Sequence, residues 1–115
     1  MAQPHFFHAT EMEWQPHPTI PGIRIKSLEN RRTFEPASVT LVQVDPGGVI
    51  APHLHEQSSE TAYVISGRAV LTLPEGDVTL ASGDGVTVPA RTLHSLRNAA
   101  DEPVEILAVH IPPTL

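Results

Sequence analysis

Three side chains that can bind a metal ion lie close together in the stretch PHLHEQSSE. Within it, His53 and His55 are separated by one residue, and in an extended strand this spacing places both imidazoles on the same face. Glu60 follows after four polar residues and opens TAYVIS, a β-branched and aromatic run that indicates a second strand. The pattern predicts a β-hairpin in which Glu60 faces the two histidines.

A fourth ligand is expected from TVPARTLHSLRN, a strand-like segment that is entered through a proline and carries His94. The expected metal ligands are therefore His53, His55, Glu60 and His94. Imidazole and carboxylate ligands accept Fe, Mn, Ni, Zn, Cu or Co. These residues are therefore candidate ligands of a divalent transition metal, whose identity the sequence leaves open.

The intervals between these residues resemble the two motifs of the cupin family. The first motif is a glycine, His-x-His, a glutamate and a second glycine, matched at Gly47, His53, His55, Glu60 and Gly67. The second is matched at Gly83, Pro89, His94 and Asn98, although Arg91 stands where the family often has a glycine. The resemblance implies a small β-barrel with one metal held by the four ligands named above. It implies no particular reaction, because the fold hosts dioxygenases, isomerases, decarboxylases and non-catalytic binding domains.

The strand pattern predicts an all-β fold independently of that resemblance. Ile23 and Ile25 alternate with Arg24 and Lys26, which is typical of a strand with one face in water. Further strands are expected in SVTLVQVD, in VEILAVHI and in a β-meander through RAVLTLP, VTL and VTVPA. Short strands with tight turns and no helical periodicity predict a single β-barrel or two-sheet jelly roll, which for a cupin is the double-stranded β-helix.

The chain is expected to form one domain, with an N-terminal arm over residues 1–22 and the barrel over residues 23–115. Four prolines in the arm exclude a long helix there. Its aromatic residues are expected either to cover the barrel or a second subunit, or to roof a ligand pocket; they are Phe6, Phe7 and Trp14. The arm's histidines lack ligand spacing and are expected at the surface; they are His5, His8 and His17.

Composition excludes several classes of function. The 115 residues include no cysteine, which removes disulfides and thiolate chemistry and fits a reducing compartment. A net charge of −6 with only 7 Lys and Arg disfavours a nucleic-acid partner. The N-terminus shows no signal-peptide pattern and the chain has no long apolar run, so a cytoplasmic protein without a membrane partner is expected.

A homodimer is expected from the apolar N-terminal arm and from apolar residues on strand faces turned away from the metal, namely Tyr63, Ile65, Leu107 and Val109. One small barrel cannot bury both faces of its strands, so a second subunit is the simplest cover.

Alternation also predicts the surroundings of the metal. Ala62, Val64 and Leu96 are expected to form apolar walls that favour a small-molecule substrate. Alternation along VEILAVHI turns His110 inward, yet a strand-end histidine bonded to backbone or water is the preferred interpretation. Gln43 is either a hydrogen-bond donor in the pocket or an outward polar residue.

Two residues are candidates for catalysis. Glu60 is the only inward carboxylate near enough to act as a general base if it leaves the metal. Arg91 either binds a substrate carboxylate at the rim or makes a weak surface ion pair.

The expected function is a metal-dependent enzyme, dioxygenase-like, acting on a substrate that chelates through two oxygens, such as a dicarbonyl, enediol or catechol. The alternatives are a non-catalytic binding or sensing cupin and a sugar isomerase or epimerase.

Overall fold

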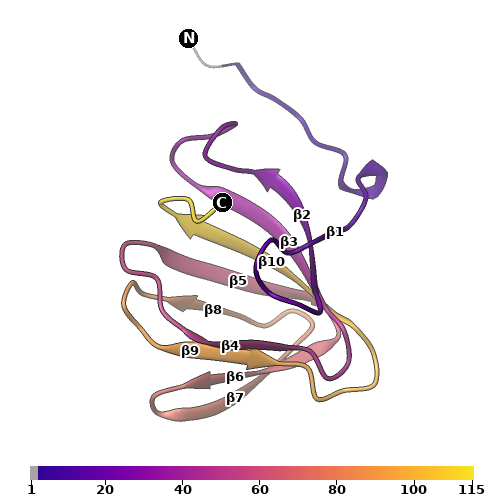
Figure 1. Cartoon of the computed structure of the whole chain (residues 1–115), viewed down its shortest axis with the longest axis vertical. Helices are drawn as coiled ribbons and strands as arrows, with labels where there is room; N and C mark the ends of the chain where they lie inside the picture. The colour runs from indigo at the N-terminus through magenta and orange to yellow at the C-terminus, as the bar shows by residue number, and fades with distance from the viewer. Residues whose placement is uncertain (1–2) are drawn as a thin grey trace.

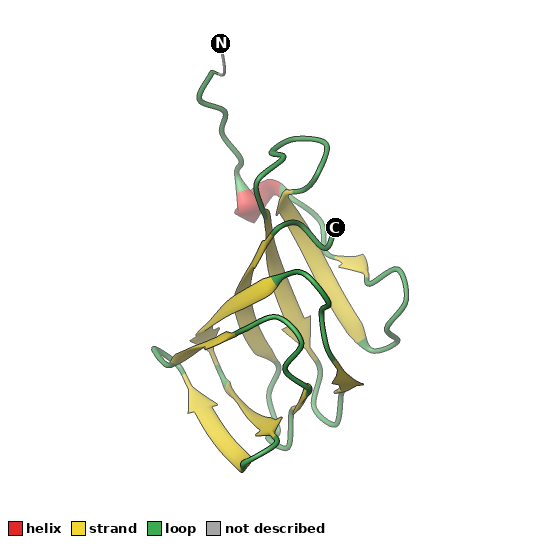
Figure 2. Ribbon diagram, turned by 90° about the vertical axis from the view of Figure 1, so that its left-hand side faces the viewer, coloured by secondary structure: helices red, strands yellow, loops and turns green. Residues whose placement is uncertain are grey.

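The computed structural model describes residues 3–115 and confirms an all-β chain. The strands are β1 Gln15–Pro16, β2 Ile23–Glu29, β3 Ser38–Val44, β4 Val49–His53, β5 Ser59–Ser66, β6 Arg68–Leu73, β7 Gly76–Ala81, β8 Gly85–Val88, β9 His94–Arg97 and β10 Val104–Ile111. Helical structure within the described part is confined to a single 3₁₀ turn, η1 Ala9–Glu11 (Figure 2). In residues 3–115, none of the helical structure is long and apolar enough to cross a membrane.

Two antiparallel sheets form the expected jelly roll (Figure 1). One sheet has six strands in the order β1-β2-β3-β10-β5-β8, and the other has four in the order β4-β9-β6-β7. Successive side chains of a strand point to opposite faces, so each sheet turns one face inward. The inward faces supply the buried core residues Ile23, Val44, Val64, Leu71 and Val104.

The strands whose alternation was clearest in the sequence form as predicted. In β2, Ile23 and Ile25 are buried while Arg24 is exposed. In β10, burial alternates without a break from Val104 to His110. This regularity places His110 on the inner face of the six-stranded sheet.

The predicted hairpin around the histidines is wrong. β4 belongs to the four-stranded sheet and pairs with β9, whereas β5 belongs to the other sheet and pairs with β10 and β8. The polar segment between His53 and Glu60 therefore crosses from one sheet to the other. Glu60 still faces the histidines, but across the interior of the jelly roll.

The predicted β-meander holds only for its first turn. β6 and β7 pair as a hairpin, from Arg68 opposite Ala81 to Leu73 opposite Gly76. β8 then leaves this sheet and pairs with β5, and β9 returns to lie between β4 and β6. These crossings close the jelly roll, and local turn signals do not reveal them.

Gly67 lies at a turn that no other residue could occupy without rearrangement. Its φ is +80°, and a Cβ there would lie 2.6 Å from the carbonyl oxygen of Pro103. The turn leads directly from β5 into β6 and so transfers the chain between the sheets. This close approach explains a glycine at the end of the first motif.

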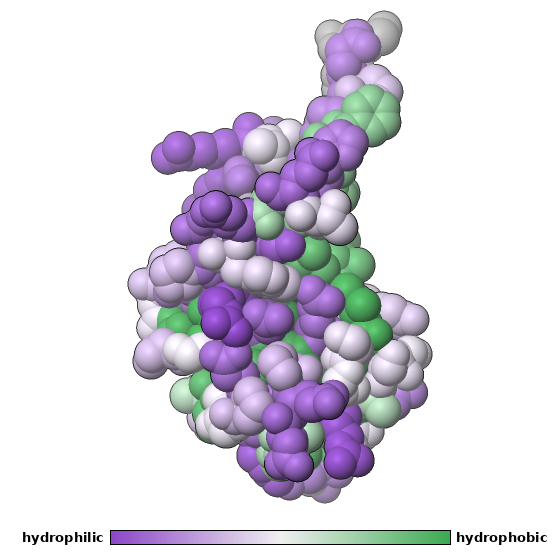
Figure 3. Space-filling view, turned by 90° about the vertical axis from the view of Figure 1, so that its right-hand side faces the viewer, coloured by the Kyte–Doolittle hydropathy of each residue, from purple (hydrophilic) through white to green (hydrophobic). Residues whose placement is uncertain are grey.

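The N-terminal arm joins the six-stranded sheet through β1, which pairs with β2. Before η1 the chain extends away from the body, and apolar surface is visible on the projecting segment (Figure 3). Phe6 is 85% exposed, and Trp14 packs under the Lys26 ammonium group. None of the three aromatic residues lines the cavity, so the alternative of a pocket roof is wrong. Trp14 instead packs against Lys26 of β2, on the barrel itself.

Candidate metal centre

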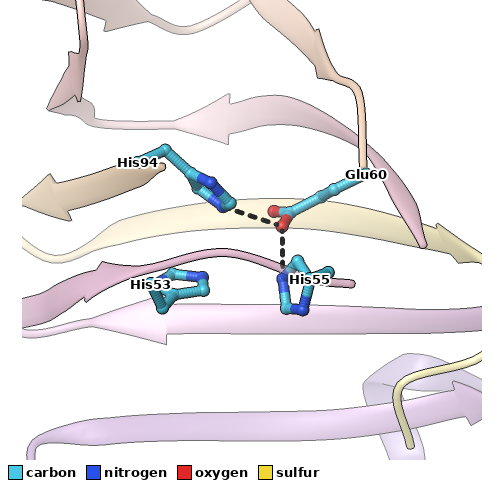
Figure 4. A group of neighbouring side chains, drawn as sticks. All are labelled: His53, His55, Glu60 and His94. Atoms are coloured by element: carbon cyan, nitrogen blue, oxygen red, sulfur yellow. Dashed lines mark ion pairs between the residues drawn. The ribbon is translucent and has the colours of Figure 1, made fainter. Parts of the chain in front are cut away.

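Side chains from both sheets form the candidate site. His53 lies opposite His94 across β4 and β9, with their ring centroids 4.3 Å apart. Glu60 lies on β5 in the facing sheet, and His55 follows His53 just beyond the end of β4. All four side chains point toward one another (Figure 4).

The predicted ligand set converges as a metal site requires. One ligand atom from each of His53, His55, Glu60 and His94 lies within 4.8 Å of the others. Glu60 Oε1 is 3.4 Å from His55 Nε2 and 3.5 Å from His94 Nε2. Four donors around so small a space fit one ion held by three imidazoles and a carboxylate.

Backbone carbonyls orient two of the imidazoles. His53 Nδ1 and His94 Nδ1 donate to the carbonyl oxygens of Ala51 and Thr92, each over 2.8 Å. This places the proton on Nδ1 and leaves the Nε2 lone pair free, the arrangement that a metal-binding histidine needs.

Two of the imidazole nitrogens are buried without a hydrogen-bond partner within residues 3–115, namely His55 Nε2 and His94 Nε2. Buried polar atoms are normally paired, because leaving them unpaired costs free energy. A divalent ion would satisfy both atoms at once. The residues therefore fit the metal that the sequence predicts.

The charges in the site depend on one another. Burial raises the pKa of Glu60, but the hydrogen bond from His110 and the contact with His94 outweigh burial and lower the pKa. Interaction with Glu60 raises the pKa of His94, against the effect of burial. Burial lowers the pKa of His55, helped by the neighbouring His110. Glu60 is therefore a carboxylate that stabilises positive charge beside it.

His110 belongs to the site, contrary to the preferred interpretation of the sequence. It lies opposite Glu60 in the ladder between β10 and β5, and its Nε2 donates to Glu60 Oε1 over 3.0 Å. Its ring centroid is 5.0 Å from that of His55. Alternation had placed His110 inward, but the pairing of β10 with β5 was needed to place Glu60 opposite it.

Arg91 is exposed at a turn after β8. Its φ of +61° is the left-handed conformation that glycine adopts readily. Its backbone N–H donates to the carbonyl oxygen of His55 over 2.7 Å, which ties this turn to the metal ligands. The turn therefore keeps the conformation expected of the family's glycine, although an arginine occupies it.

A cavity of about 540 Å³ opens beside the metal ligands. Ala62, Val64 and Leu96 line it, as predicted. The arm contributes residues 17–20 to the lining, including His17. His17 is half-buried at the cavity, so its expected place at the surface is wrong. Its Nδ1 accepts hydrogen bonds from the backbone N–H groups of Thr19 and Ile20.

The remaining candidates point away from the cavity. Gln43 Oε1 accepts from Arg24 Nε over 3.1 Å on the outer face, which settles its two alternatives in favour of an outward polar residue. Tyr63 is 48% exposed on the outer face, as its alternation with Ala62 predicts.

Comparison with known proteins agrees with this site. A family model described as "Cupin domain" matches residues 40–110, which include all four ligands. This chain belongs to the cupin family. The geometry above shows where the family's two motifs meet: each supplies ligands from a different stretch of sequence to one small space.

Relatives of this cupin include proteins of different length. A germin-like protein of Oryza sativa is 39% identical over 63% of this chain, but the match covers only 34% of that protein. An uncharacterized protein of Methanocaldococcus jannaschii is 28% identical over 86% of this chain and 81% of its own length. The structure of KdgF from Halomonas sp. superimposes with a TM-score of 0.81 at 27% identity, covering 94% of each chain.

Proposed function

We propose that this cupin is a metal-dependent enzyme of the oxygenase type that acts on a small substrate chelating through two oxygens. The observation that carries the proposal is the convergence of four ligand atoms beside a mostly apolar cavity. Four protein ligands leave two positions open on an ion that prefers six, whereas a structural site normally closes its coordination sphere. Dicarbonyls, enediols and catechols each have two oxygens close enough together to occupy both positions.

The charge of the site favours a monoanionic substrate. Three neutral imidazoles and one carboxylate would leave a divalent ion with a net charge near +1. When bound, the ion would supply Lewis acidity, and a redox-active ion would also allow reaction with dioxygen. The protein would hold the chelate among Ala62, Val64 and Leu96, which exclude competing water.

Glu60 would accept the substrate proton, and His110 would hold Glu60 through a hydrogen bond. After leaving the metal, Glu60 would take up the substrate proton on its second carboxylate oxygen, while Oε1 keeps the hydrogen bond from His110 Nε2. Arg91 would act further out, at the turn that carries the hydrogen bond to His55, and would select substrates with a carboxylate.

Oxygen uptake tests the proposal directly. Apo-protein would be reconstituted separately with iron(II), manganese(II), nickel(II) and zinc(II), and a panel of dicarbonyls, enediols and catechols would be added. We expect uptake with a redox-active metal, together with an oxidised product by mass spectrometry, and loss of both in His55→Ala. Tight binding without turnover under every metal would instead favour a binding or sensing cupin.

One observation favours a second candidate, a metal-dependent isomerase or epimerase. The buried Glu60–His110 pair offers a proton acceptor beside a proton donor, as a reaction that only moves a proton requires. Turnover with zinc(II) under anaerobic conditions would support this candidate and contradict the oxygenase. Because zinc(II) has no redox chemistry, the same reconstitution series distinguishes the two.

A further inference from the structure

Two buried polar atoms on the cavity wall take no part in the ligand set. They are Thr40 Oγ1 and His110 Nδ1, and neither has a hydrogen-bond partner within the part of the chain that the structure describes. Thr40 is 2% exposed and His110 is 9% exposed, and both line the cavity. Their polar atoms are therefore buried and unpaired in residues that line the cavity.

Strand pairing places these two side chains side by side. His110 lies opposite Ser38 and Ala108 lies opposite Thr40 in the ladder between β10 and β3. Thr40 and His110 are thus diagonal neighbours on the inner face, a separation of roughly 7–8 Å between backbones.

Neighbouring polar groups on the same face are satisfied, which makes these two atoms exceptional. Ser38 Oγ accepts from the backbone N–H of Thr114 over 3.2 Å. Glu29 Oε2 accepts from Thr33 Oγ1 over 2.7 Å. The protein therefore pairs its inward polar groups where it can, and the exceptions lie beside the metal centre.

The hydrogen-bonding character of the pair points to a hydroxyl group. His110 Nε2 donates to the Glu60 carboxylate, so in the neutral imidazole Nδ1 carries a lone pair and must accept. Thr40 Oγ1 can donate. A hydroxyl satisfies both atoms, because it donates one hydrogen bond and accepts another, whereas an ether oxygen or a methyl group cannot.

We propose that Thr40 and His110 form a hydroxyl-binding subsite beside the metal centre, and that the substrate carries a hydroxyl in addition to its two chelating oxygens. The inference rests on the proposed chelating function and narrows its substrate class. It assigns Thr40 to specificity, a role separate from metal binding.

Three probe ligands test the subsite without any turnover. Catechol, 3-methoxycatechol and pyrogallol all chelate through two neighbouring hydroxyls and differ in the substituent beside them. Pyrogallol has two equivalent chelating pairs, which by itself accounts for a gain of about twofold. Their affinities for the zinc(II)-loaded protein would be measured anaerobically by calorimetry. We expect pyrogallol to bind about tenfold more tightly than catechol, as two additional hydrogen bonds suggest, and 3-methoxycatechol to lack this gain.

Variants of Thr40 then identify the residue responsible. Thr40→Val keeps the shape and removes the hydroxyl, so the pyrogallol preference should fall to about twofold or less while catechol affinity and zinc content stay unchanged. Thr40→Ser should retain the preference. Thr61→Val is the matched control, because Thr61 lies on the outer face and bonds to Thr87 Oγ1.

The outcomes separate this inference from the proposed function. Equal binding of catechol and pyrogallol by the wild type, or an unchanged preference in Thr40→Val, would overturn the subsite while zinc-dependent catechol binding left the chelating function standing. If no probe bound the zinc form, both proposals would fail. Thermal unfolding of each variant would show whether a lost preference reflects lost folding.

Discussion

His110 and Glu60 face each other across the β10–β5 ladder, with His110 Nε2 3.0 Å from Glu60 Oε1. In the opposite sheet, His53 and His94 form the corresponding pair across β4 and β9. The metal centre therefore lies where a cross-strand pair of one sheet meets a cross-strand pair of the other. Sheet register, rather than a flexible loop, sets the positions of these four side chains.

Removing any one metal-binding histidine should strongly reduce metal content. His53→Ala, His55→Ala and His94→Ala each take away one of three imidazoles, and we expect affinity to fall by about 100-fold or more. Metal analysis after dialysis against a chelator would measure the loss, and circular dichroism should retain the β signal. His8→Ala is the control, since His8 is exposed on the arm. Full occupancy in all three variants would contradict the site.

In the apo-protein, the pKa values of His94 and His55 should shift in opposite directions because their surroundings differ. NMR titration should find His94 with a pKa above 6.5 and His55 with a pKa below 6.5. Since folding raises the pKa of His94, its contribution to stability is complete below pH 6.5 and is lost as the pH rises through the folded-state value. Glu60→Gln should lower the pKa of His94, and an unchanged value would show that Glu60 is not the cause.

Asn98, the last residue of the second motif, should matter for stability rather than for chemistry. Its amide donates to the carbonyl oxygens of Val44 and Glu102 over 3.0 and 2.7 Å, and Asn98 is 1% exposed. Asn98→Ala should cost about 1–3 kcal/mol of unfolding free energy, because it leaves the buried carbonyl group of Val44 without this partner. Chemical denaturation would measure this, with Asn30→Ala at a half-buried turn expected to cost less.

Arg91 should respond differently to glycine and to alanine. A left-handed φ costs roughly 1–2 kcal/mol for an ordinary residue, part of which the greater chain entropy of glycine offsets. Arg91→Gly should therefore stabilise the fold by about 0.5–1 kcal/mol, whereas Arg91→Ala should leave stability nearly unchanged. Both variants should weaken binding of a chelator that carries a carboxylate. If both variants prefer this chelator over its uncharged amide as strongly as the wild type does, Arg91 only shapes the turn.

We propose that a second copy of the chain covers the outer face of the six-stranded sheet. Tyr63 and Ile65 are 48% and 40% exposed there, beside the half-buried Leu107 and Val109. Light scattering at micromolar concentration should report a dimer, and Tyr63→Glu should shift it to monomer. Val78→Glu, at a comparably exposed position on the other sheet, should leave the dimer intact. A wild-type mass of one chain at high concentration would reject the proposal.

The amino-acid sequence by itself determined the ligands and most of the strands. Alternation in β2 and β10 is a local property, because neighbouring side chains of a strand always point to opposite faces. The two motifs likewise identified His53, His55, Glu60 and His94 as ligands, because the type of a residue decides whether its side chain can bind a metal. These parts of the site could be predicted without knowing which strands pair.

Only the tertiary structure decided how those parts meet. It separated β4 and β5 into different sheets, set His110 opposite Glu60 and brought Thr40 beside His110. It also brought His17 from the arm to the cavity. Pairing joins strands that lie far apart in the chain, and closure of the jelly roll selects the partners. No local pattern holds that information, because a strand with one buried face fits several neighbours equally well.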